Sequence, residues 1–189
     1  EFRAADFEAH VRKTYNPIVQ AIRALEKPVV CAVNGVAAGA GANLALACDF
    51  VLASATASFI QAFVKIGLVP DTGGTFFLPR LVGLARATAL MMLGEKLTAD
   101  EALAHGMIYR VCEPASLSRE SEAFADLLAT QATRGLGLTK RLLNASMAND
   151  LGAQLALEAE LQGEAGRTAD HAEGVAAFLQ KRAPAFVGR

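Results

Sequence analysis

A single acidic residue, Asp71, stands in the apolar segment "GLVPDTGGT", between a proline and a pair of glycines. A carboxylate in apolar surroundings can take up and return a proton, which makes it a candidate general acid or base. The rings of Phe59, Phe63, Phe76 and Phe77 are near in sequence and could supply such surroundings. An aspartate just before a helix is also a common N-cap, which binds the first backbone N–H groups. The local pattern alone favours capping.

The segment "GAGAN", Gly39 to Asn43, places two glycines at the start of an alanine- and leucine-rich stretch that predicts a helix. The first N–H groups of a helix lack intrahelical partners, so they can bind a phosphate or stabilise a thioester oxygen that gains charge. A phosphate site is weakly supported, since the Lys-Ser/Thr ending of a P-loop and the full GxGxxG spacing are both missing. From these residues alone, a glycine loop that permits close packing is favoured.

Other chemically capable residues lack the spacing that their chemistry needs. Three histidines lie far apart without HxxxH or HExxH spacing, so no metal site is expected; they are His10, His105 and His171. The chain has no GxSxG elbow, which argues against a serine hydrolase. Asp49 follows Cys48 at a predicted helix-to-strand junction, where a carboxylate usually caps a turn. We interpret Asp49 as structural.

The elements that must position Asp71 and the glycine loop alternate between helices and short strands. Apolar spacings of three and four predict an amphipathic helix from Phe7 to Leu25, which Pro17 should bend or restart. Strands are predicted in "KPVVCAVNG", "DFVLAS", "ASFIQ" and "MIYRVC", in a mixed sheet. A turn in "PDTGG" should lead into a helix that starts near Thr72.

A change in pattern near Pro114 suggests two regions. Just before it, a capping box at Thr98 to Glu101 predicts a helix that ends at Gly106. From Ser116 onward the pattern is helical throughout. We therefore predict an α/β core over residues 1–114 and a helical region over residues 115–189.

The composition indicates a globular domain that is large enough for a sizeable core. The 189 residues are 53% apolar and 20% charged, with a net charge of −1, so nucleic acid is not an expected partner. No apolar run approaches the ~20 residues that span a bilayer, and the first residues lack the order of a signal peptide, so no membrane partner is expected. The three cysteines lack CxxC spacing, which fits reduced thiols and a cytoplasmic location.

Four segments together resemble the enoyl-CoA hydratase/isomerase (crotonase) family: "KPVVCAVNGVAAGAGANLALACD", "GLVPDTGGTFFLPRLVG", "LGEKLTADEALAHGMIYRVCE" and "EGVAAFLQKRAPAFVGR". The resemblance runs from about Ile22 to Arg189. It implies an α/β fold, a spiral of strand-strand-helix units with two roughly perpendicular sheets, followed by helices that build trimers, commonly paired into hexamers. It also implies that amino-terminal strands should precede Glu1, with a first oxyanion N–H and most of the adenine-binding loop.

The resemblance assigns roles residue by residue. The second oxyanion N–H of the family falls on Ala40. The two catalytic glutamates of the hydratases fall on Asn43 and Phe63, and neither an amide nor a phenyl ring serves as a general base. Asp71 falls where a subset of the family carries a catalytic aspartate. Its segment looks most like the isomerases of phenylacetate breakdown, which rearrange ring-epoxidised phenylacetyl-CoA to an oxepin thioester.

The resemblance further implies that the substrate is an acyl-CoA, with coenzyme A entering as part of the substrate, and that no separate cofactor or metal is needed. Five residues are expected to line the substrate: Gly39, Gly41, Asn43, Phe63 and Gly73.

Several functions agree with this assignment. An acyl-CoA isomerase that shifts a double bond or rearranges a ring epoxide is favoured, because it needs one proton shuttle and a stabilised enolate. An enoyl-CoA hydratase is the first alternative, since family members often carry that name. A catalytically silent assembly protein that uses the trimer surface is the second. A dehalogenase with Asp71 as nucleophile ranks last, because that branch relies on a tryptophan and this chain has none.

Overall fold

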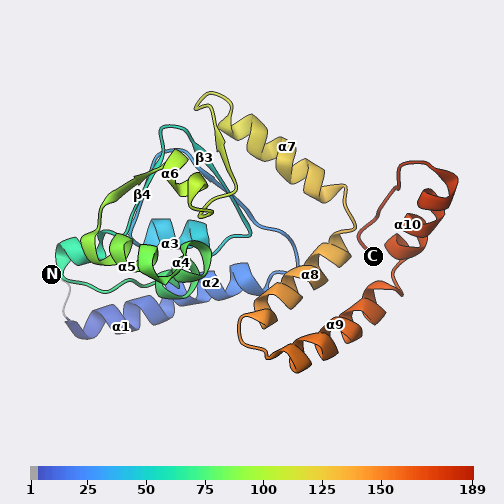
Figure 1. Ribbon diagram of the computed structural model, residues 1–189, viewed down its shortest axis with the longest axis horizontal. Coiled ribbons are helices and arrows are strands. Elements are labelled where there is room, and N and C mark those ends of the chain that lie inside the picture. The colour runs from blue at the N-terminus through green and yellow to red at the C-terminus, as the bar shows by residue number, and fades with distance from the viewer. Residues whose placement is uncertain (1–3) are drawn as a thin grey trace. The chain divides into compact units, whose positions relative to one another are not determined.

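The computed structural model describes residues 4–189, with side chains from Asp6 onward. The chain forms two compact units (Figure 1). The core unit comprises the chain up to Arg23 together with Val29–Glu122, and the helical unit comprises Ala24–Pro28 and Ala123–Arg189. The predicted functional division after residue 114, with an oligomerisation region from residue 115, stays a prediction.

Two small three-stranded sheets form the core unit, as expected for an α/β fold. The first sheet is parallel throughout, with the strand order β1-β3-β6. The second has the order β2-β4-β5, in which β2 and β4 are parallel and β4 and β5 antiparallel. The bounds of the six strands are β1 Val30–Val33, β2 Val36–Ala38, β3 Phe50–Ser54, β4 Ser58–Ile60, β5 Lys96–Thr98 and β6 Arg110–Cys112.

Helices connect these strands and complete the core unit. They are α1 Ala4–Lys13, α2 Tyr15–Ala24, α3 Ala40–Leu46, the 3-10 helix η1 Ala62–Ile66, α4 Gly74–Val82, α5 Leu84–Leu93 and α6 Ala99–Ala104. Helices α3, α4 and α5 lie together below the strands in Figure 1, and α4 contacts both α3 and α5. Small side chains allow this close packing, since Ala42 on α3 and Ala53 on β3 have no exposed surface. Leu78 belongs to the same core cluster and is equally buried.

Several predicted elements are confirmed and others are shorter or were missed. The first amphipathic helix stops at Lys13 and restarts at Tyr15, which places Pro17 in the first turn of α2, where proline is tolerated. The capping box is present, with Thr98 and Glu101 bonded to each other's backbone N–H groups. Strands β2 and β5 were not predicted, because Val36–Ala38 runs directly into the glycine loop and Lys96–Thr98 into the capping box, so neither segment stands out as a separate apolar run.

Asp49 is structural, as predicted. Its Oδ1 accepts from Arg23 at 2.9 Å and its Oδ2 accepts from the N–H of Val29 at 2.8 Å. The three cysteines are free thiols: Cys31, Cys48 and Cys112. Burial raises the pKa of the Cys112 thiol, whereas a hydrogen bond with Cys48 lowers the pKa of Cys31.

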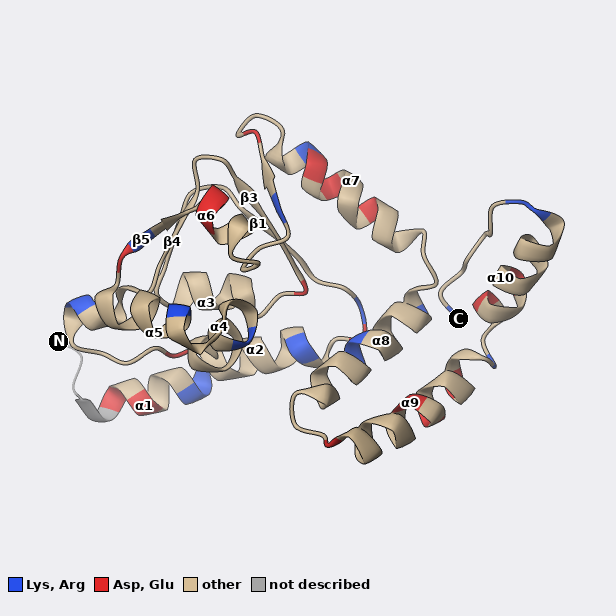
Figure 2. Cartoon of the chain, in the orientation of Figure 1, with Lys and Arg blue, Asp and Glu red and all other residues tan. Residues whose placement is uncertain are grey.

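The helical unit contains the end of α7 (Leu117–Ala129) and the helices α8 Thr133–Ser146, α9 Leu151–Ala165 and α10 Ala169–Gln180. Figure 2 shows that the charged side chains of α9 are all acidic. Arg134 on α8 forms ion pairs with Glu164 on α9 and with Glu26. Gly137 permits this approach, because a Cβ there would lie 2.3 Å from the carbonyl oxygen of Glu26. No described helix is long and apolar enough to cross a bilayer.

The last residues after Gln180 are not helical, so the prediction of an unbroken helical pattern to the end of the chain was wrong. Two carboxylates on α10 hold this tail instead. Asp170 is 2% exposed and accepts from the N–H groups of Val187 and Gly188 at 2.7 and 2.9 Å. Glu173 accepts from Arg182 and from the N–H of Ala185.

Acid should release part of this tail. The hydrogen bonds from Arg182 and from the Ala185 N–H lower the pKa of Glu173 to about 2, well below the ~4.3 of a free glutamate. The ionised Glu173 therefore contributes stability above pH ~4.3, and this contribution is lost as the pH falls toward the folded-state value. We expect the Tm difference between the wild type and Glu173→Gln to be constant above pH ~5 and to shrink below pH ~4. Thermal melts of both proteins across this range measure it, and a difference unchanged at pH ~3 would contradict the prediction.

Candidate active site

Asp71 lies in a tight turn between η1 and α4. The two residues after it both have left-handed backbone angles, with φ of 54° at Thr72 and 77° at Gly73. The turn is closed by the N–H of Gly74, which donates to the carbonyl oxygen of Asp71 at 2.9 Å. Gly73 is required at its position, because its φ is positive and a Cβ would lie 2.8 Å from the ring of Phe77.

The carboxylate of Asp71 does not cap the helix that follows, so the capping interpretation was wrong. The N-cap of α4 is Gly73, and no described side chain accepts a hydrogen bond from the first turn. The Asp71 Oδ1 instead accepts from the hydroxyl of Thr72 at 2.7 Å. One carboxylate oxygen is thereby held in place, and among the described residues no donor contacts Oδ2.

Thr72 is held in an uncommon conformation. A β-branched residue with positive φ is a genuine outlier, and such strain costs ~1–3 kcal/mol. Thr72 is 1% exposed, so its burial and its hydroxyl bond to Asp71 offset the strain. Strain of this kind concentrates at functional sites, which makes the turn a candidate site on physical grounds.

A pocket of about 370 Å³ opens at Asp71. Its walls come from α1, α2 and the segment before the turn, and they are lined by Phe7, Glu8, Val11, Arg12, Asn16, Leu68, Val69 and Asp71. Glu8 and Arg12 pair with each other at 2.8 Å, and both side chains are largely exposed. The pocket lining therefore combines apolar side chains, of which Phe7, Leu68 and Val69 are exposed, with an exposed ion pair and Asp71.

The four phenylalanines that were expected near Asp71 differ in position. Phe59, Phe63 and Phe77 are buried. Phe76 is 43% exposed and its ring lies under the guanidinium of Arg80, at 3.9 Å from the centroid. Apolar surroundings for Asp71 thus come partly from residues the sequence did not indicate, including Leu68 and Val69.

The glycine loop forms the start of α3. Gly39 is the N-cap, with φ 53° and ψ −123°, and its N–H donates to the carbonyl oxygen of Ile60. Ala40 is the first helical residue, and no described acceptor contacts its backbone N–H. A Cβ on Gly41 would meet nothing within 4 Å, whereas one on Gly39 would touch the ring of Phe63 at 3.5 Å. The backbone N–H of Ala40 thus has no acceptor among the described residues, and the Phe63 ring lies beside its neighbour Gly39.

Asn43 connects this helix to the turn that carries Asp71. Its Nδ2 donates to the carbonyl oxygen of Asp71 at 2.9 Å, and its Oδ1 accepts from Gln61 at 2.8 Å. Residues three apart on a helix share a face, so Ala40 and Asn43 lie on the same face of α3. The Asn43 bond thereby links α3, which begins at Ala40, to the backbone of the turn that carries Asp71. Gln61 was not predicted, although a lone polar residue in "SFIQAF" must find a buried partner.

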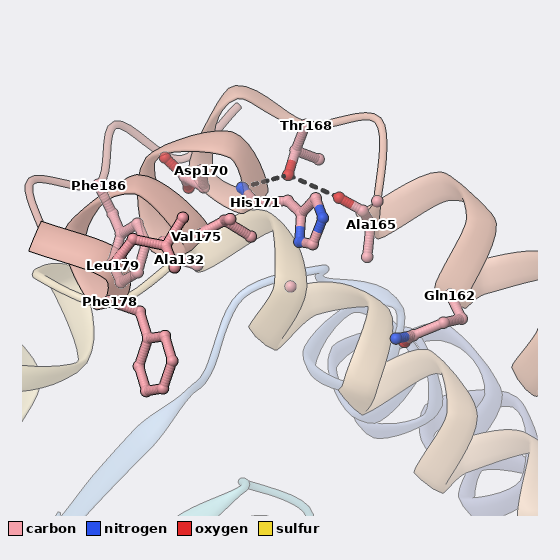
Figure 3. A pocket seen from close by; sticks show the side chains of 13 residues that line it. Ala132, Gln162, Ala165, Thr168, Asp170, His171, Val175, Phe178, Leu179 and Phe186 are labelled. Atoms are coloured by element: carbon pink, nitrogen blue, oxygen red, sulfur yellow. Dashed lines mark hydrogen bonds between the residues drawn. The ribbon is translucent and has the colours of Figure 1, made fainter.

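A second pocket, of about 460 Å³, lies in the helical unit. Figure 3 shows Val175, Leu179 and Phe186 grouped on one side of it. The backbone N–H of His171 donates to Thr168, and the carboxylate of Asp170 is occupied by the tail. This pocket is larger than the one at Asp71, but the one carboxylate that lines it is already engaged by the tail, so we place the chemistry at Asp71.

A family model and several known proteins match nearly the whole chain. A family model described as Enoyl-CoA hydratase/isomerase matches residues 2–189. The chain is 50% identical to the 1,2-epoxyphenylacetyl-CoA isomerase of Escherichia coli (strain K12), over 98% of this chain and 71% of that protein. It is 48% identical to a "Probable enoyl-CoA hydratase" of Rhodobacter capsulatus, over 97% of this chain and 72% of the relative. A trans-2-decenoyl-[acyl-carrier-protein] isomerase of Streptococcus mutans is 41% identical, over 98% of this chain and 72% of the relative.

Solved structures agree with the sequence relatives. An enoyl-CoA hydratase from Polaromonas sp. JS666 matches with a TM-score of 0.92 and 36% identity, over 98% of this chain and 72% of that one. An enoyl-CoA hydratase/isomerase from Cupriavidus metallidurans CH34 matches with a TM-score of 0.91 and 38% identity, over 98% of this chain and 70% of that one.

Proposed function

Since the chain belongs to the enoyl-CoA hydratase/isomerase (crotonase) family, we propose that it is an acyl-CoA isomerase in which Asp71 is the single acid/base group. The crotonase-type α/β fold expected from the sequence is confirmed by the solved structures that match it. The observation that carries the proposal is the setting of Asp71, which opens into a pocket and has one oxygen fixed by Thr72.

The proposed reaction moves one proton. The carboxylate of Asp71 removes a proton from C2 of a 3-enoyl thioester, and the electron pair of the broken C–H bond moves toward the thioester carbonyl. The protonated Asp71 then returns the proton at C4, so the double bond moves from C3–C4 to C2–C3. Substrate and product contain the same atoms, and no co-reactant is needed. Rearrangement of a ring-epoxidised phenylacetyl-CoA to an oxepin thioester likewise conserves all atoms.

The start of α3 would stabilise the charge that develops in this reaction. The N–H of Ala40 is proposed to donate to the thioester oxygen as it becomes an enolate oxygen. Gly39, Gly41, Phe63 and Gly73 stay proposed substrate contacts. Asn43, which was also expected to line the substrate, has no exposed surface, and its amide bonds Gln61 and Asp71 instead. The acyl group and coenzyme A together form the substrate, and no separate cofactor is proposed.

A ring-epoxidised phenylacetyl-CoA is the preferred substrate of the proposal. The relative that is 50% identical carries the name 1,2-epoxyphenylacetyl-CoA isomerase, and another at 41% is also named an isomerase. A homotrimer or a hexamer and a cytoplasmic location are proposed along with this function.

Water addition is a second candidate, because the relative at 48% identity is named a hydratase. Two features oppose it. At the two positions where the resemblance places the catalytic glutamates of hydratases, this chain has Asn43 and Phe63, and both side chains are buried. Neither can transfer a proton to water at neutral pH.

Parallel assays with two substrates separate these candidates. We expect trans-3-hexenoyl-CoA to be converted to the conjugated 2-enoyl thioester, which appears as a rise in absorbance. Hydration of crotonyl-CoA, followed as a fall in absorbance, should have a kcat/KM at least ~10²-fold lower, because acid/base catalysis contributes that much and its groups are missing. Equal turnover of the two thioesters would favour the hydratase. Failure to bind any acyl-CoA by calorimetry would favour the catalytically silent assembly protein.

A further inference from the structure

Three polar groups form a continuous buried chain beside the proposed base. The side chain of Gln61 is 4% exposed, and that of Asn43 is completely buried. The amide of Gln61 donates to Asn43 at 2.8 Å, and the amide of Asn43 donates to the carbonyl oxygen of Asp71 at 2.9 Å. Asn43 and Asp71 are separated by 28 positions, so this contact joins two distant segments.

The direction of these hydrogen bonds is fixed by chemistry. The carbonyl oxygen of Asp71 can only accept, so it must face the Nδ2 of Asn43. The Oδ1 of Asn43 then faces Gln61 and needs the Nε2 of that residue as its donor. The Oε1 of Gln61 is consequently left buried without a hydrogen-bond partner in the described chain. An unpaired buried acceptor costs free energy. The structure thus keeps the hydrogen bond from Asn43 to Asp71 while the Oε1 of Gln61 remains without a donor in the described chain.

Gly74 leaves just enough room for this contact. A Cβ at Gly74 would lie 2.2 Å from the Nδ2 of Asn43, a distance that no pair of atoms tolerates. The N–H of Gly74 donates to the same carbonyl oxygen of Asp71. Both lone pairs of that oxygen are therefore occupied, one by the turn itself and one by α3.

We propose that Asn43, oriented by Gln61, is a positioning residue that sets the location of Asp71 relative to the start of α3. The proposal rests on the function proposed above for Asp71. Asn43 reaches the backbone of Asp71, while Ala40 lies three residues earlier on the same helix. The separation between the proposed base and the proposed oxyanion donor is thus set through a single rigid element. A misplacement of ~1 Å in such a geometry can cost ~10²-fold in rate.

The test uses Asn43→Leu, which keeps a similar volume and removes the donor. We expect kcat for trans-3-hexenoyl-CoA to fall between ~10-fold and ~10²-fold, with KM changed by less than ~3-fold, because positioning acts on the reacting geometry. Gln61→Met should lower kcat less, and the double variant Asn43→Leu/Gln61→Met should be no worse than Asn43→Leu alone. If Asn43→Leu does not fold, Gln61→Met carries the same test.

Two controls separate positioning from general damage. Val51→Ala removes buried apolar volume from β3 and should lower Tm without lowering kcat. In an Asp71→Asn background, Asn43→Leu should cause no further loss, because a residue that acts only through Asp71 has nothing left to position.

Two results would overturn the proposal: an unchanged kcat in Asn43→Leu, or an additional tenfold loss in the Asp71→Asn background. Either result leaves the isomerase assignment standing, provided that Asp71→Asn itself is inactive. If Asp71→Asn isomerises at the wild-type rate, the assignment of the base and the positioning role both fail.

Discussion

Asp71→Asn is expected to lower kcat for isomerisation of trans-3-hexenoyl-CoA by ~10²–10⁴-fold, the usual contribution of a general acid/base group. Asparagine has the same shape as aspartate, and its Oδ1 can still accept the hydroxyl of Thr72, so the turn should persist. The amide cannot take up a proton from C2. Steady-state kinetics give kcat and KM, and calorimetry with the 2-enoyl thioester should show binding within ~3-fold of the wild type.

Asp49→Asn is the matched control, since it makes the same chemical change at a carboxylate elsewhere in the core unit. It weakens the ion pair with Arg23 and the bond to the Val29 N–H. We expect Tm to fall and kcat to stay unchanged. A substantial residual rate in Asp71→Asn, well above one hundredth of the wild type, would show that another group is the base.

Ala40→Val is expected to lower kcat by ~10²–10³-fold, the effect of losing one oxyanion donor. The backbone N–H of Ala40 has no partner in the described chain, and a β-branched side chain beside it should push the thioester oxygen out of reach. Valine has a lower helix propensity than alanine, but at the first helical position this effect is small. Kinetics, circular dichroism and size-exclusion chromatography together measure activity, folding and assembly.

The control for this substitution is Ala104→Val, which makes the same change at an exposed position at the end of α6. It should alter neither kcat nor assembly. Full activity in a folded Ala40→Val protein would show that the Ala40 N–H is not an oxyanion donor. Unfolding of Ala40→Val but not of Ala104→Val would identify the glycine loop as a packing element.

Sequence reasoning was strongest where short-range chemistry determines the structure. The capping box at Thr98 and Glu101 satisfies helix N–H groups locally, and the restart at Tyr15 places Pro17 in a first turn, where its missing N–H is tolerated. Strands β2 and β5 could not be found this way, because tertiary pairing defines them, whereas β4 and β6 of equal length lie in segments that the sequence predicts as strands. The tail after Gln180 was misjudged for a similar reason, since the carboxylates of Asp170 and Glu173 bind its backbone.

In the candidate site, too, features set by residue type could be predicted, whereas features set by tertiary contacts could not. Asp71 and the glycine loop were visible because their residue types are chemically distinctive. Whether Asp71 caps α4 could not be decided from the sequence, because the answer depends on the positive φ of Thr72 and on its hydroxyl. The Gln61–Asn43–Asp71 chain was not visible either, since it joins segments far apart in sequence.

The close packing of Asn43 beneath Gly74 also constrains how this chain could evolve. A glutamate at position 43 is longer than asparagine, and the surrounding residues leave this side chain no exposed surface. Placing a second carboxylate at position 63 would also require replacing the buried Phe63. A longer side chain at position 43 would disturb the turn of Asp71 by itself, because Asn43 bonds that turn and a Cβ on Gly74 would already overlap its amide. The packing at Gly74 therefore restricts the order in which this chain could acquire a pair of carboxylates.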